Sequence, residues 1–176
     1  MAFVVAGLVL VGAIGLLNLL LLTAVIRRLR RQEEERGEAL RSGPRPGEEL
    51  PEFSAVALSG RSVSRAGLAG GPAVLVFLST GCPACPAAVP RLVEYAAQAG
   101  LDRERTIVVI TGAESEAGEL IEPLAGVATV VTEPFPGELS RTFSVSGTPT
   151  TVIVGMDGRV AYAEAGTSPL IAPAAA

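Results

Sequence analysis

The distribution of hydrophobic and polar positions begins with one long apolar segment. Residues 2–26 contain no charged side chain, and only Asn18 and Thr23 are clearly polar. As a helix this segment would be about 37 Å long at ~1.5 Å per residue, which is enough to cross a hydrocarbon core of about 30 Å. We therefore predict a transmembrane helix over residues 1–26.

Two other interpretations of this segment fit less well. A buried helix of the core would need shielding on every face, because the segment is apolar all round, and a chain of 176 residues offers little room for that. A cleavable signal peptide has a basic region before its apolar core and a small-residue cleavage site after it, and the segment has neither. A retained single-pass anchor is the prediction.

A charged segment and a Gly- and Pro-rich run follow the anchor over residues 27–49. The charged part lacks proline and predicts a juxtamembrane helix, whereas the run GPRPGEELP at residues 43–51 ends it, because neither Gly nor Pro continues a helix. A single globular domain is then expected over residues 50–165. The remaining residues, 166–176, show no pattern of a packed element and are expected to be a disordered tail.

Within this domain, continuous apolar runs alternate with segments of helical character. A run of consecutive apolar residues indicates a strand buried on both faces of a sheet, and turn signals at Ser59-Gly60 and Asp157-Gly158 indicate two hairpins. The predicted strands lie in residues 52–58, 61–64, 72–80, 105–111, 127–132 and 150–164, and the predicted helices in 87–100, 114–126 and 136–145. This order predicts an α/β domain with a central mixed β-sheet flanked by helices.

Composition limits the chemistry available to the domain. The 14 basic residues are all arginine, histidine is absent and the net charge is −4. Without histidine the chain lacks the usual general base near neutral pH and the commonest metal ligand, and no basic patch points to nucleic acid. We therefore expect no cofactor, no metal and no nucleic-acid partner, and chemistry based on Cys, carboxylate, hydroxyl or backbone groups.

The two cysteines of the chain, Cys82 and Cys85, are three residues apart and are surrounded by prolines. As a structural staple they would be inefficient, because a cross-link over a four-residue loop contributes only ~2 kcal/mol, against about 4–5 kcal/mol for a hundred-residue loop. Zinc needs four ligands and would find only two here, and a copper chaperone meets the same objection. Two thiols that merely pack in a core remain an alternative, but redox chemistry is favoured.

The surroundings of the pair supply a mechanism for redox chemistry. Cys82 falls where the strand at 72–80 ends and where a helix is predicted to begin near Pro83, a residue that suits a first helical turn. A thiolate there faces the free N–H groups and the positive end of the helix dipole, which stabilise the charged form of the sulfur. Cys82 is therefore the predicted nucleophile, and Cys85, one turn further on, is placed to resolve a mixed disulfide.

Three motifs together resemble the thioredoxin superfamily. They are the C-x-x-C at a helix start, a proline five residues after the second cysteine (Pro90), and the loop Gly147-Thr148-Pro149-Thr150 before a predicted strand. The segment LPEFSAVALSGRSVS in front of them is similar to the redoxin branch. The anchor, its arginine-rich exit and the stretch FLSTGCPAC are together similar to TlpA-like and MauD-like membrane-anchored thioredoxins. The resemblance covers about residues 50–164.

The resemblance implies a thioredoxin-like fold and roles for several residues. Pro149 would be a cis-proline beside the disulfide, and the backbone of Thr148 would pair with a bound substrate chain. Gly81, Pro83 and Ala84 would form the active-site loop around the cysteines.

The chain also departs from the superfamily pattern. Gly81 stands where thioredoxins usually have tryptophan, and Val76 stands where they often carry a buried acid, so no general base is assigned. Thr80 lies only two residues before Cys82, which misses the Thr-x-x-Cys spacing of peroxiredoxins and disfavours peroxidase activity. Phe135, between two prolines, is better explained by loop geometry than by a substrate contact.

These observations predict a membrane-anchored thiol–disulfide oxidoreductase. Its partners would be cysteine-containing protein substrates, a redox partner that recycles the disulfide, and the membrane through residues 2–26. The alternative is a redox-inactive, membrane-tethered binding or assembly factor on the same fold. The sequence leaves open whether the enzyme acts as an oxidant, a reductant or an isomerase.

Two arguments about the side of the membrane oppose each other. By the positive-inside rule, the arginines that directly follow the anchor favour a cytoplasmic domain. These arginines are Arg27, Arg28, Arg30 and Arg31. Disulfide chemistry and the MauD-like arrangement favour an extracytoplasmic domain, because disulfides form and persist outside the cytoplasm. We expect a single-pass protein of the cell membrane with an extracytoplasmic catalytic domain.

Overall fold

A computed structural model of the chain describes residues 42–166 and 170, together with the isolated positions Met1, Gly7, Gly12 and Gly15. Apart from those isolated positions, the predicted anchor, the predicted charged helix and most of the predicted tail lie outside the described residues. Among the described residues, no helix is both long and apolar enough to cross a membrane. The chain divides into two compact units, Met1–Ala39 and Leu40–Ala176, and the second contains the domain.

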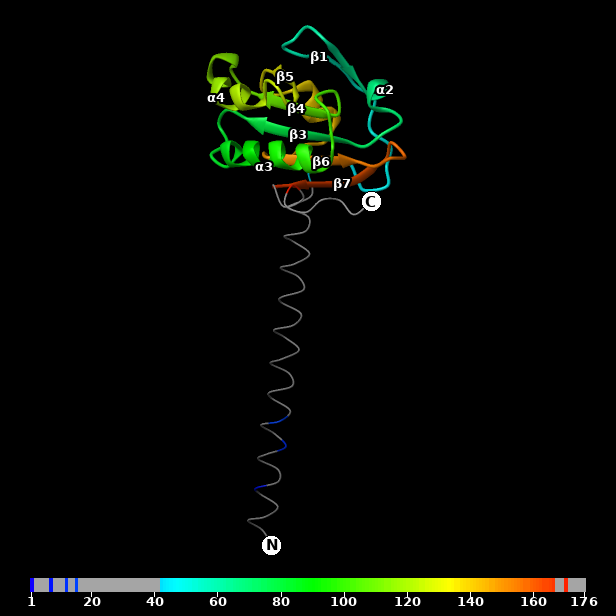
Figure 1. Ribbon diagram of the computed structural model, residues 1–176. Coiled ribbons are helices and arrows are strands. Elements are labelled where there is room, and N and C mark those ends of the chain that lie inside the picture. The colour runs from blue at the N-terminus through cyan, green and yellow to red at the C-terminus, as the bar shows by residue number, and fades with distance from the viewer. Residues whose placement is uncertain (2–6, 8–11, 13–14, 16–41, 167–169, 171–176) are drawn as a thin grey trace. The chain divides into compact units, whose positions relative to one another are not determined.

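The domain is built on a five-stranded sheet with the strand order β5-β4-β3-β6-β7 (Figure 1). Its strands are β3 (Ala73–Ser79), β4 (Thr106–Thr111), β5 (Thr129–Glu133), β6 (Thr150–Val154) and β7 (Val160–Ala165). β3, β4 and β5 are parallel, and β6 and β7 form an antiparallel hairpin whose first strand pairs with β3. The predicted central mixed sheet is confirmed, and β3, which leads into the cysteines, lies at its centre.

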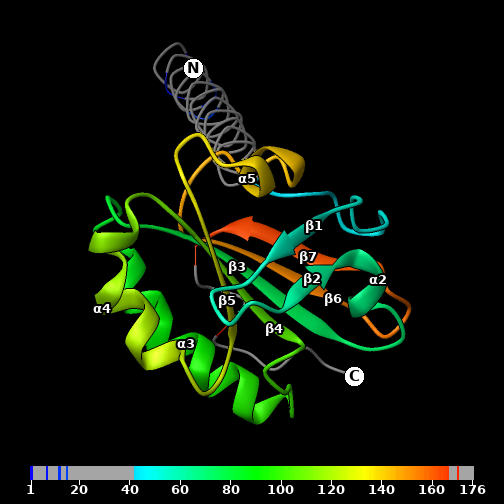
Figure 2. The ribbon, with the colours of Figure 1, turned by 90° about the horizontal axis from the view of Figure 1, so that it is seen from above.

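The elements outside the sheet are β1 (Ser54–Val56), β2 (Ser62–Ser64), α2 (Arg65–Leu68), α3 (Cys85–Gln98), α4 (Gly118–Ile121), α5 (Glu138–Thr142) and the 3-10 turns η1 (Glu114–Glu116) and η2 (Glu122–Leu124). α3 and α4 pack on one face of the sheet, whereas α5, the hairpin β1–β2 and α2 pack on the other (Figure 2). The predicted arrangement of a sheet flanked by helices is therefore confirmed.

Two differences from the sequence-based expectation have local causes. The helix predicted over residues 114–126 is divided into η1, α4 and η2, because Gly118 weakens a helix and Pro123 lacks the N–H that a continuous helix needs. The short helix α2 is absent from the sequence pattern. Its N-cap is Ser64, whose hydroxyl accepts a hydrogen bond from the Gly67 N–H at 3.3 Å. The helix itself is too short to produce a helical periodicity in the sequence.

Side chains of the central strand alternate between two hydrophobic clusters. Val76 and Leu78 belong to the cluster under α3, and Leu75 and Phe77 belong to the cluster under α5. This alternation follows from the two-residue repeat of a strand, and all four side chains are at most 1 % exposed. Leu170, in the predicted tail, is buried in the cluster under α3, so the packing of this face extends beyond β7.

Candidate active site

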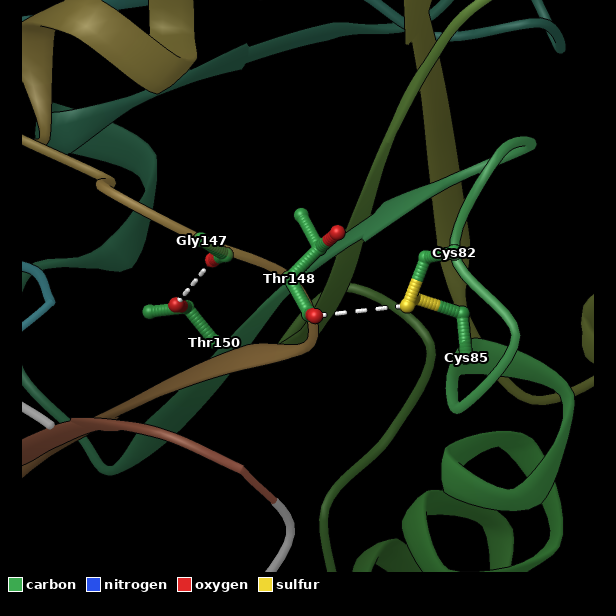
Figure 3. The surroundings of a disulfide bond; sticks show 5 residues. All are labelled: Cys82, Cys85, Gly147, Thr148 and Thr150. Carbon is green, nitrogen blue, oxygen red and sulfur yellow. Dashed lines mark hydrogen bonds between the residues drawn. A yellow bond between two sulfur atoms is a disulfide. The ribbon is translucent and has the colours of Figure 1, made fainter.

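The two cysteines lie in the connection between β3 and α3, at the carboxyl end of the central strand. Cys82 is half-buried, whereas Cys85 is the first residue of α3 and is fully buried. Their sulfur atoms form a disulfide, and their Cα atoms are 5.4 Å apart (Figure 3). Cys82, the predicted nucleophile, is therefore the cysteine that a partner can reach.

The start of α3 differs from the prediction. The helix begins at Cys85 rather than near Pro83, because residues 82–84 form a turn that the Cys85 N–H closes onto the Cys82 carbonyl oxygen at 3.2 Å. The proline of the first helical turn is Pro86, at a position where the missing N–H leaves no hydrogen bond unmade. The cysteine pair thus spans a turn and a helix start, not two positions of one helix.

Gly81, Pro83 and Ala84, the predicted active-site loop, are exposed around the disulfide. A Cβ atom at Gly81 would meet nothing within 4 Å, so the position that tryptophan takes in thioredoxins opens onto free space here. None of the three residues is charged. The sulfur atoms are therefore approached across a small, uncharged loop.

A second loop, 66 positions further along the chain, lies against the disulfide. The Thr148–Pro149 peptide bond is cis, as the resemblance implies, and the Thr148 carbonyl oxygen lies 3.2 Å from Cys82 Sγ (Figure 3). In the dithiol state the Cys82 S–H can donate to this oxygen, whereas a thiolate would face its negative end. The helix N-terminus and the Thr148 carbonyl therefore act in opposite directions on the charged form of Cys82.

Buried hydroxyl groups hold this second loop in place. The Thr150 hydroxyl donates to the Gly147 carbonyl oxygen at 2.6 Å and is paired with the Ser42 hydroxyl at 2.7 Å. Ser42 also accepts from the Ser146 N–H at 3.0 Å, and it is only 1 % exposed. Sequence reasoning named Thr150 only as part of the loop motif, without a role, and missed Ser42. Thr150 could have been found as the hydroxyl that follows the loop proline, but Ser42 has no local signal, because its partners are 104 and 108 positions away.

The buried surroundings of Cys85 are apolar. Val76, at the position where thioredoxins often carry an acid, is fully buried in the same cluster as Cys85. Glu133 is the one buried carboxylate of the described residues, and it lies on the opposite face of the sheet, where it accepts from the Leu139 N–H at 2.8 Å and the Ser140 N–H at 3.1 Å. Among the described residues, no buried acid under α3 is therefore in position to move a proton for the sulfur atoms.

The described ranges contain no group of three or more Cys, Asp or Glu side chains that could hold a metal ion. The two cysteines, which are the only thiols of the sequence, are joined to each other. The chemistry that the arrangement supports directly is thiol–disulfide exchange, which needs no added group.

Comparison with known proteins assigns the family. A sequence profile of the Redoxin family matches residues 45–175. The chain belongs to the redoxin family. This redoxin is 32 % identical over 120 residues to the methylamine utilization protein MauD of Methylobacillus flagellatus, in an alignment that covers 66 % of this chain and 55 % of MauD. The predicted membership of the redoxin branch, close to MauD, is confirmed, although the chain spans only about half the length of this relative.

Solved structures of redox proteins share the fold of this redoxin. One is a thiol:disulfide interchange protein DsbE from Chlorobium tepidum, with 25 % identity, a TM-score of 0.55, and coverage of 74 % of this chain and 89 % of that one. Another is a secreted disulfide oxidoreductase from Mycobacterium tuberculosis, with 28 % identity, a TM-score of 0.51, and coverage of 61 % and 79 %. The predicted thioredoxin-like fold is confirmed.

Proposed function

We propose that this redoxin is a membrane-anchored thiol–disulfide oxidoreductase that exchanges a disulfide with cysteine pairs of partner proteins. The observation that carries the proposal is the unequal exposure of two joined cysteines, half-buried Cys82 in front and buried Cys85 behind. The names of two structural relatives, thiol:disulfide interchange protein and disulfide oxidoreductase, describe those proteins and support the same chemistry here.

The exchange proceeds in two steps that balance in atoms and electrons. In the reducing direction, the Cys82 thiolate attacks one sulfur of a partner disulfide, and the other partner sulfur leaves as a thiolate. The Cys85 thiolate then attacks the Cys82 sulfur of the mixed disulfide, so that the second partner sulfur leaves and the Cys82–Cys85 disulfide forms. Two electrons pass to the partner, whose thiolates take up the two protons that the dithiol released. The oxidising direction is the reverse, and a separate redox partner restores the starting state.

The loop of Thr148 and Pro149 would hold the partner chain during the exchange. The Thr148 N–H has no hydrogen-bond partner among the described residues, and its carbonyl oxygen lies beside Cys82 Sγ. An extended segment can pair with such a free backbone N–H and carbonyl as a strand pairs with a sheet edge. This pairing would bring the attacked sulfur in line with Cys82.

Membrane anchoring is part of the proposal because residues 2–26 are long and apolar enough to span a bilayer. Disulfide chemistry supports an extracytoplasmic domain, whereas the arginines after the anchor oppose it. Alkaline phosphatase fused after Ala176 should be active in cells, because the enzyme folds only in an oxidising compartment. Activity of a β-galactosidase fusion alone would place the domain in the cytoplasm.

Trapping in the full-length chain tests the redox proposal. The variant Cys85→Ser should accumulate a stable mixed disulfide with insulin, because the resolving step is blocked, and the matched variant Cys82→Ser should accumulate none. Wild type should accelerate insulin reduction by dithiothreitol, and Cys82→Ser should lower the rate to the uncatalysed level. Trapping by neither variant, together with no acceleration by wild type, would favour a redox-inactive binding factor. Equal trapping by the two variants would contradict the assignment of Cys82 as the nucleophile.

A further inference from the structure

A cavity of about 360 Å³ adjoins the disulfide site on the side of α5. Two hydroxyl-bearing residues at the ends of neighbouring strands line it, Ser79 of β3 and Thr111 of β4, which are partners in the strand register. Thr148 lines it as well, and the Thr148 carbonyl oxygen is 3.2 Å from Cys82 Sγ. The cavity therefore shares with the site of sulfur exchange the loop of Gly147 and Thr148, which Figure 3 shows beside the disulfide.

Phe135 lines this cavity with 85 % of its surface exposed. A single exposed apolar side chain is ordinary on a protein surface, but the loop that carries this one is braced. Glu133, at the end of β5, accepts from the Leu139 N–H at 2.8 Å, the Ser140 N–H at 3.1 Å and the Ser140 hydroxyl at 2.6 Å. These bonds fix both ends of the loop before a partner arrives, so little conformational entropy is lost on binding.

Among the residues that the structure describes, Arg141 is the only charged one that lines this cavity. Its Nε donates to the Gly137 carbonyl oxygen at 3.3 Å, and no carboxylate of the described part of the chain lies within ion-pair distance of it. The outer nitrogens of the guanidinium group are thus available to an acceptor from another molecule. A carboxylate suits them best, because it matches the guanidinium in both charge and planar geometry.

We propose that this cavity docks the residues that flank the attacked cysteine of a partner protein, and that it selects segments with one large apolar side chain and one carboxylate. Phe135 and Val145 contact the apolar side chain, and Arg141 binds the carboxylate. This inference rests on the proposed function and names its substrate class. The occupant is a protein segment rather than a small thiol, because the free N–H and the carbonyl of Thr148 offer pairing to a peptide backbone.

Binding is measured first, with the full-length oxidised protein and labelled peptides in which serine replaces the cysteine, so that no disulfide can form. The four peptides have the central sequences Phe-Ser-Glu, Ala-Ser-Glu, Phe-Ser-Gln and Ala-Ser-Gln. We expect the first to bind about tenfold more tightly than the last. The variant Phe135→Ala should lower the preference for Phe over Ala to about twofold or less. Arg141→Gln should remove the preference for Glu over Gln together with its salt dependence.

The reaction is measured with the same four sequences carrying cysteine, each as its symmetrical disulfide. The reduced protein converts one peptide disulfide into two peptide thiols and acquires the Cys82–Cys85 disulfide, so acid quenching and alkylation give a second-order rate constant. These constants should follow the order of the affinities. The control variants Met156→Ala and Arg45→Gln change an exposed apolar and an exposed basic residue that do not line the cavity, and they should leave every ratio unchanged.

The outcomes separate this inference from the proposed function. In one outcome, the protein reacts with hydroxyethyl disulfide, a small uncharged probe, but the four peptides have equal rate constants and equal affinities. This result would overturn the docking site and leave the proposed function. The expected binding preferences without any reaction would overturn the proposed function and leave the docking site. Faster reaction with glutathione disulfide than with all four peptides would assign the cavity to a small anionic thiol and overturn the inference.

Discussion

The two faces of the sheet differ in what they hold beside the disulfide. Under α3, Cys85 belongs to a hydrophobic cluster in which Val76 and Leu92 have no exposed surface. Under α5, the ends of the parallel strands carry polar groups, among them the buried carboxylate of Glu133 and the hydroxyl of its register partner Thr111. The disulfide lies where a dry face meets a polar one.

This difference shows that one face of the sheet buries Cys85 and the other holds the loop that would contact a partner. The α3 face shelters Cys85 among apolar side chains, and its buried Thr106 and Thr151 hydroxyls each donate to a backbone carbonyl oxygen. This pairing matters because a buried polar group costs free energy unless it is hydrogen-bonded. On the α5 face, polar groups fix the loop that carries Phe135. Glu133 does so by accepting hydrogen bonds from two backbone N–H groups of α5. Neither face brings an acid to the sulfur atoms, so we expect solvent to accept the proton of Cys82.

The largest effect is expected when the dry face receives a charge. Val76→Asp should lower the free energy of unfolding by about 3–5 kcal/mol at pH 7, because the new carboxylate would be buried without a partner. The hydroxyl of its register partner Thr151 already donates to the Gly166 carbonyl oxygen at 3.2 Å. Burial raises the pKa of the introduced carboxyl above its unfolded value of about 3.9. The loss should therefore be close to that of a neutral polar residue near pH 3 and grow as the pH rises.

Urea denaturation at pH 3, 5 and 7 measures this loss. Val76→Asn is the matched control, because it has nearly the same shape without a titratable group, and its loss of stability should not vary with pH in this range. A Val76→Asp protein as stable at pH 7 as at pH 3 would show that water or an acceptor reaches the α3 face.

A smaller effect is expected when the polar face loses its charge. Glu133→Gln should lower the free energy of unfolding by about 1.5–3 kcal/mol, because hydrogen bonds to a charged acceptor are replaced by bonds to a neutral amide. Glu94→Gln, an exposed position of α3 on the other face, should stay within about 0.5 kcal/mol of wild type. Denaturation midpoints of the two variants compare the faces directly. Equal midpoints would mean that Glu133 does not hold α5.

The smallest effect concerns the two tyrosines of the chain, which both pack on the α3 side. Burial, a hydrogen bond to Glu164 and the negative charge of Glu164 raise the pKa of Tyr162 to about 12, and burial raises the pKa of Tyr95. A raised folded pKa gives stability that is present below pH 10, the unfolded value, and is lost between pH 10 and 12.

Phenolate absorbance measures both ionisations. Both tyrosines should ionise above pH 10 in the native protein, and near pH 10 when the protein is unfolded in guanidinium. Tyr162→Phe should remove the later of the two native steps, and Glu164→Gln should move that step to lower pH. Native titration of both tyrosines near pH 10 would contradict the dry character of this side.

The α3 face could be predicted from the sequence, because its signals are local. Continuous apolar runs at residues 72–80 and 105–111 mark β3 and β4, and the cysteines directly follow the first run. The cis state of Pro149 came from the likeness of its loop to a known family and not from the physics of its residues. The start of α3 was placed too early, since a turn that closes onto Cys82 looks in sequence like a first helical turn.

The α5 face could not be predicted in the same way, because it depends on contacts between distant positions. The N-cap of α5 is Gly137, which has no side chain to cap with, and Glu133 supplies the acceptor from four residues earlier. A Cβ atom at Gly137 would collide with that carboxylate, so the glycine is required by a partner that the sequence pattern does not reveal. Phe135 was judged to be loop geometry for the same reason, since the cavity beside it is built from three separate segments.

The hydroxyl of Ser42 attaches the N-terminal end of the domain to the loop beside the disulfide. Ser42 is bonded to the Ser146 N–H and paired with Thr150, and the N–H of Gly43 donates to the Ser144 carbonyl oxygen at 3.2 Å. Tension applied to the chain ahead of residue 42 would therefore act on the loop that carries Thr148 and on Thr150, the first residue of β6. A truncated domain that starts after residue 43 would leave these groups without partners. A force on a tether at this end of the domain would thus also act on the loop that carries Thr148.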